Sequence, residues 1–160
     1  MKNHHDPLAA AMFLGIAMGV ASSAAVGAGN KACAMVTPAE LEASLGRKVT
    51  LGAGSVMPGG VEVCSGSGSG LEVMIRVFKR TDDPSGETEK AGIEALRKAG
   101  VKVEVQKFGP IGCAVMESTS ATTSCSAAKP PLFAVIEVSG KEKIPMERLR
   151  PVAEKMMSRL

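Results

Sequence analysis

The sequence predicts an α+β domain, in which helices pack on one face of a mainly antiparallel sheet of about five strands. Strand-like segments follow one another in runs instead of alternating singly with helices, which is typical of antiparallel sheets. Three segments have the caps or the apolar spacing of helices, and four cysteines offer two covalent links. The expected element order is α-β-β-α-β-β-β-α.

The first 28 residues have the organisation of a secretory signal peptide. A short polar start precedes an apolar run over residues 8–20, and small residues then lead to a cleavage site after Ala28, with Ala25 as the alternative. The run is shorter than the ~20 residues that span a bilayer, so we expect no membrane span after the leader is cleaved. The sequence therefore predicts a signal peptide over 1–28 and a single exported domain over 29–160, in the periplasm or outside the cell.

All four cysteines, Cys33, Cys64, Cys113 and Cys125, follow the leader. An even number of cysteines in an exported chain predicts two disulfides. We favour Cys33–Cys64 with Cys113–Cys125, because each bridge then lies within one half of the chain. The chain has no C-x-x-C pair, so the cysteines are expected to be structural.

The first helix is predicted from local signals that follow Cys33. Thr37 and Glu40 have the spacing of a capping box, in which each side chain binds a backbone N–H at the helix start. Pro38 suits the first helical position, and Gly46 suits the left-handed residue that ends a helix. We therefore expect a short helix between Thr37 and Gly46.

Strands are expected next, with glycine-rich segments between them. The segment 71–78 alternates apolar residues at period two and is the strongest strand candidate in the chain. Residues 65–70 read Ser-Gly-Ser-Gly-Ser-Gly, and this composition predicts a flexible connection. The strand candidates in this half are 49–51, which is short, 61–64 and 71–78, so two or more strands are expected here.

In the second half, a helix is expected over 86–99, with Ser85 as its cap and Gly100 at its end. Residues 118–128 are rich in serine, threonine and alanine and are expected to form a loop that Cys125 holds. The strands expected in this half are 101–105, 111–117 and 132–138.

The last helix is predicted from apolar residues at helical spacing. These residues are Leu149, Val152, Met156 and Leu160. Pro151 conflicts with a regular helix interior, because proline lacks the N–H and clashes with the preceding turn. Two solutions remain open: the regular helix begins near Arg150, or an earlier turn is kinked at Pro151.

Residues that carry catalysis or bind metals are scarce beyond the leader. Both histidines, His4 and His5, lie in the leader, which removes the usual general base and the commonest metal ligand. Glu40 and Glu42 are two positions apart on a helix and therefore point apart. We expect no catalytic residue, no metal site and no cofactor, so the protein is predicted not to be an enzyme.

Charge and composition also limit the partners. The formal net charge is only +3, and acidic and basic residues are interspersed. The chain contains no tryptophan or tyrosine to stack on single-stranded bases. Nucleic acid is therefore not an expected partner.

The Ser/Gly run after Cys64 resembles, over about six residues, the periplasmic C-type lysozyme inhibitors, whose inhibitory loop presents small polar residues to the enzyme. This resemblance implies an inhibitor of a secreted hydrolase as an alternative function, with Ser65, Ser67 and Ser69 in the contact loop. The aromatic-rich remainder of that family is missing here.

Copper binding is a second alternative, because thioethers bind Cu(I) and seven methionines lie beyond the leader. No Met-x-x-Met pair is present. Met74, Met116 and Met156 fall on positions typical of a core, where methionine fills gaps. Core packing is therefore the preferred interpretation of the methionines.

The opening segment Cys33-Ala-Met-Val-Thr-Pro-Ala-Glu-Leu-Glu-Ala-Ser-Leu-Gly46 resembles small disulfide-containing domains of exported bacterial proteins and lipoproteins, including actinobacterial ones related to sensor ectodomains. Cys64, the segment 108–112 and the segment 149–160 fall in matching places. Two features depart from that pattern: no aromatic residue follows Cys64, and no lipobox precedes Cys33. The resemblance implies an α+β fold and a binding or structural role outside the cytoplasm. Our leading hypothesis is a non-enzymatic exported binding domain, whose partner is a protein, a cell-envelope component or a small apolar ligand.

Overall fold

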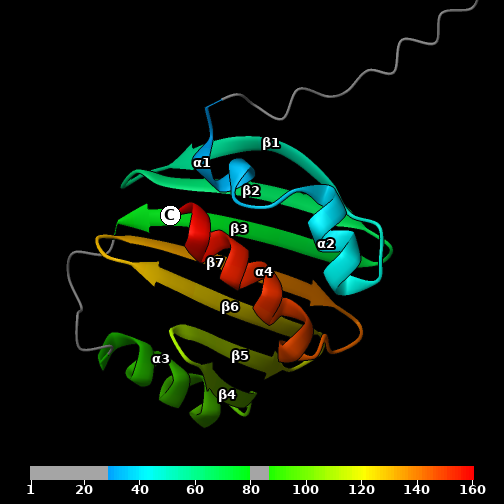
Figure 1. The fold of residues 1–160 in the computed structure, drawn as a ribbon. Coiled ribbons are helices and arrows are strands. Elements are labelled where there is room, and N and C mark those ends of the chain that lie inside the picture. The colour runs from blue at the N-terminus through cyan, green and yellow to red at the C-terminus, as the bar shows by residue number, and fades with distance from the viewer. Residues whose placement is uncertain (1–28, 80–86) are drawn as a thin grey trace, which may run out of the picture.

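The computed structural model describes residues 29–79 and 87–160 and shows an α+β fold (Figure 1). A seven-stranded antiparallel sheet has the strand order β1-β2-β3-β7-β6-β5-β4. The predicted class is confirmed, but the predicted five strands and their order are wrong in detail, because runs of three and four strands replace runs of two and three. The predicted signal peptide over 1–28 lies outside the described residues.

The elements have the following bounds. The strands are β1 Thr50–Met57, β2 Val61–Gly68, β3 Leu71–Lys79, β4 Lys102–Phe108, β5 Ile111–Glu117, β6 Ala121–Lys129 and β7 Leu132–Gly140. The helices are α1 Lys31–Ala34, α2 Pro38–Leu45, α3 Glu87–Lys98 and α4 Met146–Arg159.

Helices α1, α2 and α4 cover one face of the sheet, which we call the covered face (Figure 1). Alternate residues of each central strand point to this face and are buried, as β3 shows with Leu71, Val73, Ile75 and Val77. The buried side of α4 packs onto them through Leu149, Val152 and Met156, among others. The core therefore lies between α4 and the middle of the sheet.

One row of the covered face crosses the sheet from β2 to β5. Cys64, Ile75, Ile136, Cys125 and Cys113 are successive partners in register, and all five are buried. The row carries both disulfides, because Cys113 bonds directly to Cys125 and Cys64 bonds to Cys33 of α1. This pairing is the one that the spacing of the cysteines favoured.

Capping interactions determine where the N-terminal helices α1 and α2 begin and where α2 ends. Thr37 accepts from the N–H of Glu40 while the Glu40 carboxylate accepts from the N–H of Thr37, so the capping box is complete. Gly46 closes α2 in the left-handed conformation at φ 67°. The short helix α1 has its own cap, Asn30, whose side chain accepts from the N–H of Cys33.

Residues 65–68 of the Ser/Gly run form the second half of strand β2, so the predicted flexible connection over 65–70 is wrong. A Cβ atom on Gly68 would lie 2.3 Å from the carbonyl oxygen of Lys48, and one on Gly66 would lie 2.6 Å from that of Thr50. The two glycines are needed because the backbone that leads into β1 lies against them. Only the turn after β2, with Ser69 at φ 52° and Gly70 at φ 75°, has the conformation of a tight hairpin.

Strand β6 replaces most of the loop predicted over 118–128. Its covered-face residues are Ala121, Thr123, Cys125 and Ala127, which are all buried and all small. Small side chains let α4 lie close above this strand, and the Thr123 hydroxyl donates to the carbonyl of Ile144 at 2.6 Å. The composition of β6 resembles that of a loop because α4 leaves no room above the strand for larger side chains.

Helix α4 contains Pro151 in its interior. It begins at Met146, five residues before the proline, so of the two solutions left open, the one in which the regular helix begins near Arg150 is wrong. Pro151 is exposed, and its ring therefore does not enter the core that Leu149 and Val152 form. Burial of one face of α4 outweighs the hydrogen bond that the proline removes.

Candidate functional site

The sheet face opposite α1, α2 and α4 carries the candidate site, and we call it the open face. Its residues alternate with those of the core: on β3 they are Glu72, Met74, Arg76 and Phe78, and on β7 they are Phe133, Val135, Glu137 and Ser139. These side chains are half-buried or exposed. Met74, which the sequence placed in the core, is 40% exposed here.

A hollow of about 550 Å³ lies on the open face of β1, β2, β3 and β7, and we call it the polar hollow. Four hydroxyl side chains line it, from Thr50, Ser65, Ser67 and Ser139. Its other prominent lining side chains are Glu72, Met74 and Glu137. The hollow therefore combines hydrogen-bonding hydroxyls with carboxylates.

The polar hollow exists because β2 carries only small side chains where β3 carries long ones. Ser65 lies opposite Met74 in register, and Ser67 lies opposite Glu72. The serines form a low floor, and the side chains of β3 form the wall beside it. The Ser-Gly repeat thus has two uses: its glycines admit the backbone on the covered face, and its serines leave space on the open face.

A second hollow of about 280 Å³ lies across β7, β6, β5 and β4 and the end of β3, and we call it the apolar hollow. Its apolar lining residues are Phe78, Val105, Ala114, Phe133 and Val135. The rings of Phe78 and Phe133 are stacked, with their centroids 6.1 Å apart. Gly112, Ser124 and Ser126 keep the floor low, and Lys107 stands at the edge on β4.

The two hollows adjoin on the sheet. Glu137 of β7 lines the polar hollow, and its direct partner in register, Ser124 of β6, lines the apolar hollow. Directly opposite residues of an antiparallel pair have Cβ atoms about 5 Å apart. A single ligand that crosses the strands can therefore contact both hollows.

The charges on the open face are partly paired. The Arg76 guanidinium forms an ion pair with Glu137, next to the boundary between the hollows. Within residues 29–79 and 87–160, Glu72 has no ion-pair partner, and neither has Lys107. One end of the open face thus carries a free carboxylate and the other a free ammonium group.

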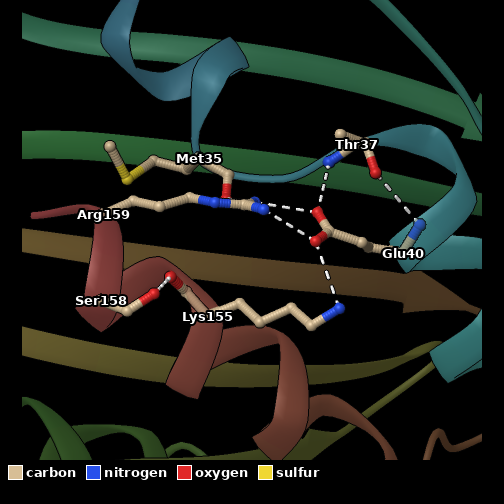
Figure 2. A network of polar contacts seen from close by, with 6 residues as sticks. All are labelled: Met35, Thr37, Glu40, Lys155, Ser158 and Arg159. Atoms are coloured by element: carbon tan, nitrogen blue, oxygen red, sulfur yellow. Dashed lines mark hydrogen bonds and ion pairs between the residues drawn. The ribbon is translucent and has the colours of Figure 1, made fainter.

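A further charge network joins the helices (Figure 2). Arg159 donates to both carboxylate oxygens of Glu40, at 2.7 and 2.8 Å, and Lys155 donates at 3.2 Å. The Arg159 guanidinium, helped by the N–H of Thr37 and by Lys155, holds the pKa of Glu40 well below its usual range. Arg159 also donates to the Met35 carbonyl, so the network fastens the end of α4 to α2 and to the segment before it.

A hollow of about 290 Å³ between α2 and α4 lies beside this network. Its charged lining residues already have partners: Glu40 and Lys155 bind each other, and Arg148 donates to the Leu45 carbonyl. We therefore assign this hollow to the packing of the two helices, and the open face remains the candidate site.

The structure places the three predicted contact serines differently from one another. Ser65 and Ser67 lie on strand β2 in the polar hollow, and Ser69 lies in the hairpin turn, where its hydroxyl donates to the Lys48 carbonyl. The sequence did not identify the open-face residues of β3 and β7. The sequence did contain a signal for them. In the strands expected at 71–78 and 132–138, every second residue belongs to a less apolar set, and these residues are the ones on the open face.

The alternatives from the sequence receive no specific support. The segment 65–68 belongs to a strand and is not a protruding inhibitory loop. The methionines are dispersed, since Met156 is in the core and Met57 is exposed at the end of β1. No group of three or more histidine, cysteine or acidic side chains suited to a metal ion occurs in the described part of the chain. None of the described helices combines the length and the apolar character that crossing a membrane requires.

Comparison with known proteins gives a likeness of fold. No family model and no curated protein matches the sequence. The extracellular domain of PknH from Mycobacterium tuberculosis is similar in structure, with a TM-score of 0.52 and 9% identity, over 80% of this chain and 93% of that domain. An uncharacterised protein from Mycobacterium smegmatis has a TM-score of 0.39 and 10% identity, over 78% of this chain and 94% of that protein. The first likeness shows that the fold occurs in an extracellular domain.

Proposed function

We propose that this chain is a non-enzymatic, exported binding domain, and that its ligand lies across the two hollows of the open face. The observation that carries this proposal is the pair of adjoining hollows on the face opposite the three packed helices. Two disulfides and a fold found in an extracellular domain support export. The ligand is a molecule or a polymer segment of the cell envelope or its surroundings.

The arrangement favours binding over catalysis. Nucleophilic catalysis by a hydroxyl typically relies on a base within hydrogen-bond reach of that hydroxyl. Among the described residues, no hydroxyl of the polar hollow is hydrogen-bonded to Glu72 or Glu137. Glu137 is instead engaged by Arg76. Hydroxyls, a free carboxylate and an apolar hollow suit recognition of a ligand with several kinds of group.

The test is a titration of the isotope-labelled, oxidised protein with fractions of the cell envelope, followed by backbone amide shifts. The fractions are solvent-extracted lipids, released glycans and released peptides. We expect at least one fraction to shift amides of β2, β3, β6 and β7 that flank the hollows. The same fraction should have little effect on Ser124→Trp, whose indole occupies the boundary between the hollows.

A matched variant, Ala43→Trp, places the same side chain in the hollow between α2 and α4. It should respond to the active fraction as the unmodified protein does. Shifts confined to the helices, or equal shifts in Ser124→Trp and the unmodified protein, would show that the open face is not the site. Absence of any response to all three fractions would also contradict the proposal.

A further inference from the structure

The charge of the polar hollow restricts the ligand that it accepts. Its charged lining residues, Glu72 and Glu137, are both acidic. Arg76 neutralises Glu137, whereas the carboxylate of Glu72, beside its register partner Ser67, has no ion-pair partner among residues 29–79 and 87–160. A group that fills this hollow gains from a positive charge and from N–H donors, because carboxylate and hydroxyl oxygens accept hydrogen bonds.

The apolar hollow restricts the chemical nature of the other end of the ligand. Two of the exposed large apolar side chains of the described chain lie on the open face: Met74, 40% exposed, and Val105, 45% exposed. Met74 lines the polar hollow, and Val105 lines the apolar hollow. Val105, Phe78 and Val135 form the apolar surface of that second hollow, which contact with a hydrocarbon group stabilises, and Arg76 separates Met74 from Phe78 along β3.

The strand register gives the distance between the carboxylate end of the polar hollow and the far part of the apolar hollow. Glu72 on β3 and Met116 on β5 belong to one cross-sheet row, and Ala114 lies two residues along β5. Three strand spacings and one two-residue step separate Glu72 from Ala114 by roughly 16 Å. This span suits an extended chain of dodecyl length and exceeds that of a hexyl chain.

We propose that the open face binds a cationic amphiphile, a molecule with an ammonium head group and an aliphatic chain. This inference rests on the proposed function. The ammonium group lies in the polar hollow against Glu72, with hydroxyls of Ser67 and Ser139 as further acceptors. The chain passes Ser124 and enters the apolar hollow. Lys107 at the far end repels a positive group there, so the charges also set the direction of the ligand.

The test uses dodecylamine as the probe at pH 7, at concentrations below micelle formation, with amide shifts to locate the site. Dodecyl sulfate and dodecyl glucoside have the same chain with an anionic and a neutral head group. Hexylamine has the same head group with a short chain. We expect dodecylamine to bind more tightly than the other three and to shift amides around both hollows.

Variants separate the role of charge from that of shape. Glu72→Gln should weaken dodecylamine binding by about two- to fivefold, as expected for an exposed ion pair, and should leave dodecyl glucoside unaffected. Glu42→Gln, on the exposed side of α2, is the matched control and should not change binding. Ala114→Trp should abolish binding by filling the apolar hollow. Circular dichroism and intact mass check that each variant is folded and has both disulfides.

Two outcomes would overturn the assignment of a cationic amphiphile. The first is equal or tighter binding of dodecyl sulfate or dodecyl glucoside, together with no effect of Glu72→Gln; if Ala114→Trp still abolishes binding, the open face remains the binding site for another ligand. The second is that dodecylamine shifts no open-face amides. In that case the titration with envelope fractions still tests the proposed function independently.

Discussion

Replacement of Gly68 by alanine tests whether the Ser/Gly run is a strand that lies under a neighbouring backbone segment. The added Cβ would lie 2.3 Å from the carbonyl oxygen of Lys48 and 3.1 Å from the Cα of Val49. Both neighbours are backbone atoms, so the clash cannot be relieved by rotating a side chain. Main-chain shifts of this kind destabilise by typically about 1–3 kcal/mol. We expect Gly68→Ala to lower the free energy of unfolding by that amount.

The assay is guanidinium denaturation of the oxidised protein followed by circular dichroism, because the chain has no tryptophan or tyrosine for fluorescence. Two controls accompany it. Ser67→Ala, on the open face of the same strand, should change the free energy of unfolding by less than about 0.5 kcal/mol. Gly92→Ala makes the same chemical change where nothing lies within 4 Å, inside helix α3, and should stabilise by about 0.5–1 kcal/mol if α3 unfolds together with the sheet.

A Gly68→Ala variant as stable as the unmodified protein would refute this reasoning. It would mean that the segment before β1 does not lie against β2. The serines of β2 would then not be fixed on the open face, and the polar hollow would lose its floor.

Three further predictions concern contacts that join the helices and the strands to one another. Glu40→Gln should lower the free energy of unfolding by about 1–2 kcal/mol at pH 7, since Arg159 loses its charged acceptor. Because the folded-state pKa of Glu40 is depressed, this contribution is present above the unfolded pKa near 4.5 and is lost as the pH falls below it, so the two denaturation curves should converge in acid. Replacing both cysteines of the α1–β2 disulfide by alanine should reduce the denaturation midpoint more than the same change in the β5–β6 disulfide. The sequence separations are 31 and 12, and the loop-entropy model gives about 4 and 3 kcal/mol. Thr123→Val should destabilise by about 1–3 kcal/mol, measured by denaturation, because it leaves the carbonyl of Ile144 buried without its donor.

Local signals predicted the parts of the fold that depend on neighbouring residues. The capping box of Thr37 and Glu40 and the closing Gly46 need only their own helix, so the limits of α2 follow from the sequence. Alternation at period two likewise predicted β3, and a strongly apolar run predicted β7. The α+β class followed from the runs of strands.

Elements of the fold that depend on residues far away in the sequence were not predicted. Gly66 and Gly68 have the composition of a linker until the backbone of residues 48–51 is placed against them. The small residues of β6 have the composition of a loop until α4 is placed above them. In both cases a neighbour far along the chain determines why the side chains are small.

The candidate site was predicted least. Ser65 and Ser67 were named from the resemblance of the Ser/Gly run to an inhibitory loop, but their place in a hollow requires the register that sets them opposite Met74 and Glu72. The adjoining position of Glu137 and Ser124 depends in the same way on the pairing of β6 with β7. Strand order and register across seven strands arise from packing and cannot be read from one segment at a time.

Successive residues of each strand lie on opposite faces of the sheet. Selection for binding and selection for stability therefore act on different residues of the same strand. Even-numbered residues of β3 face the hollows, and odd-numbered ones face the helices. Substitutions at the first set can change what is bound while the second set and the two disulfides keep the framework. Insertion of a single residue within such a strand would exchange the two faces and disturb both at once. Divergence of recognition on this scaffold should therefore proceed by substitution within the strands and by length changes only in the turns.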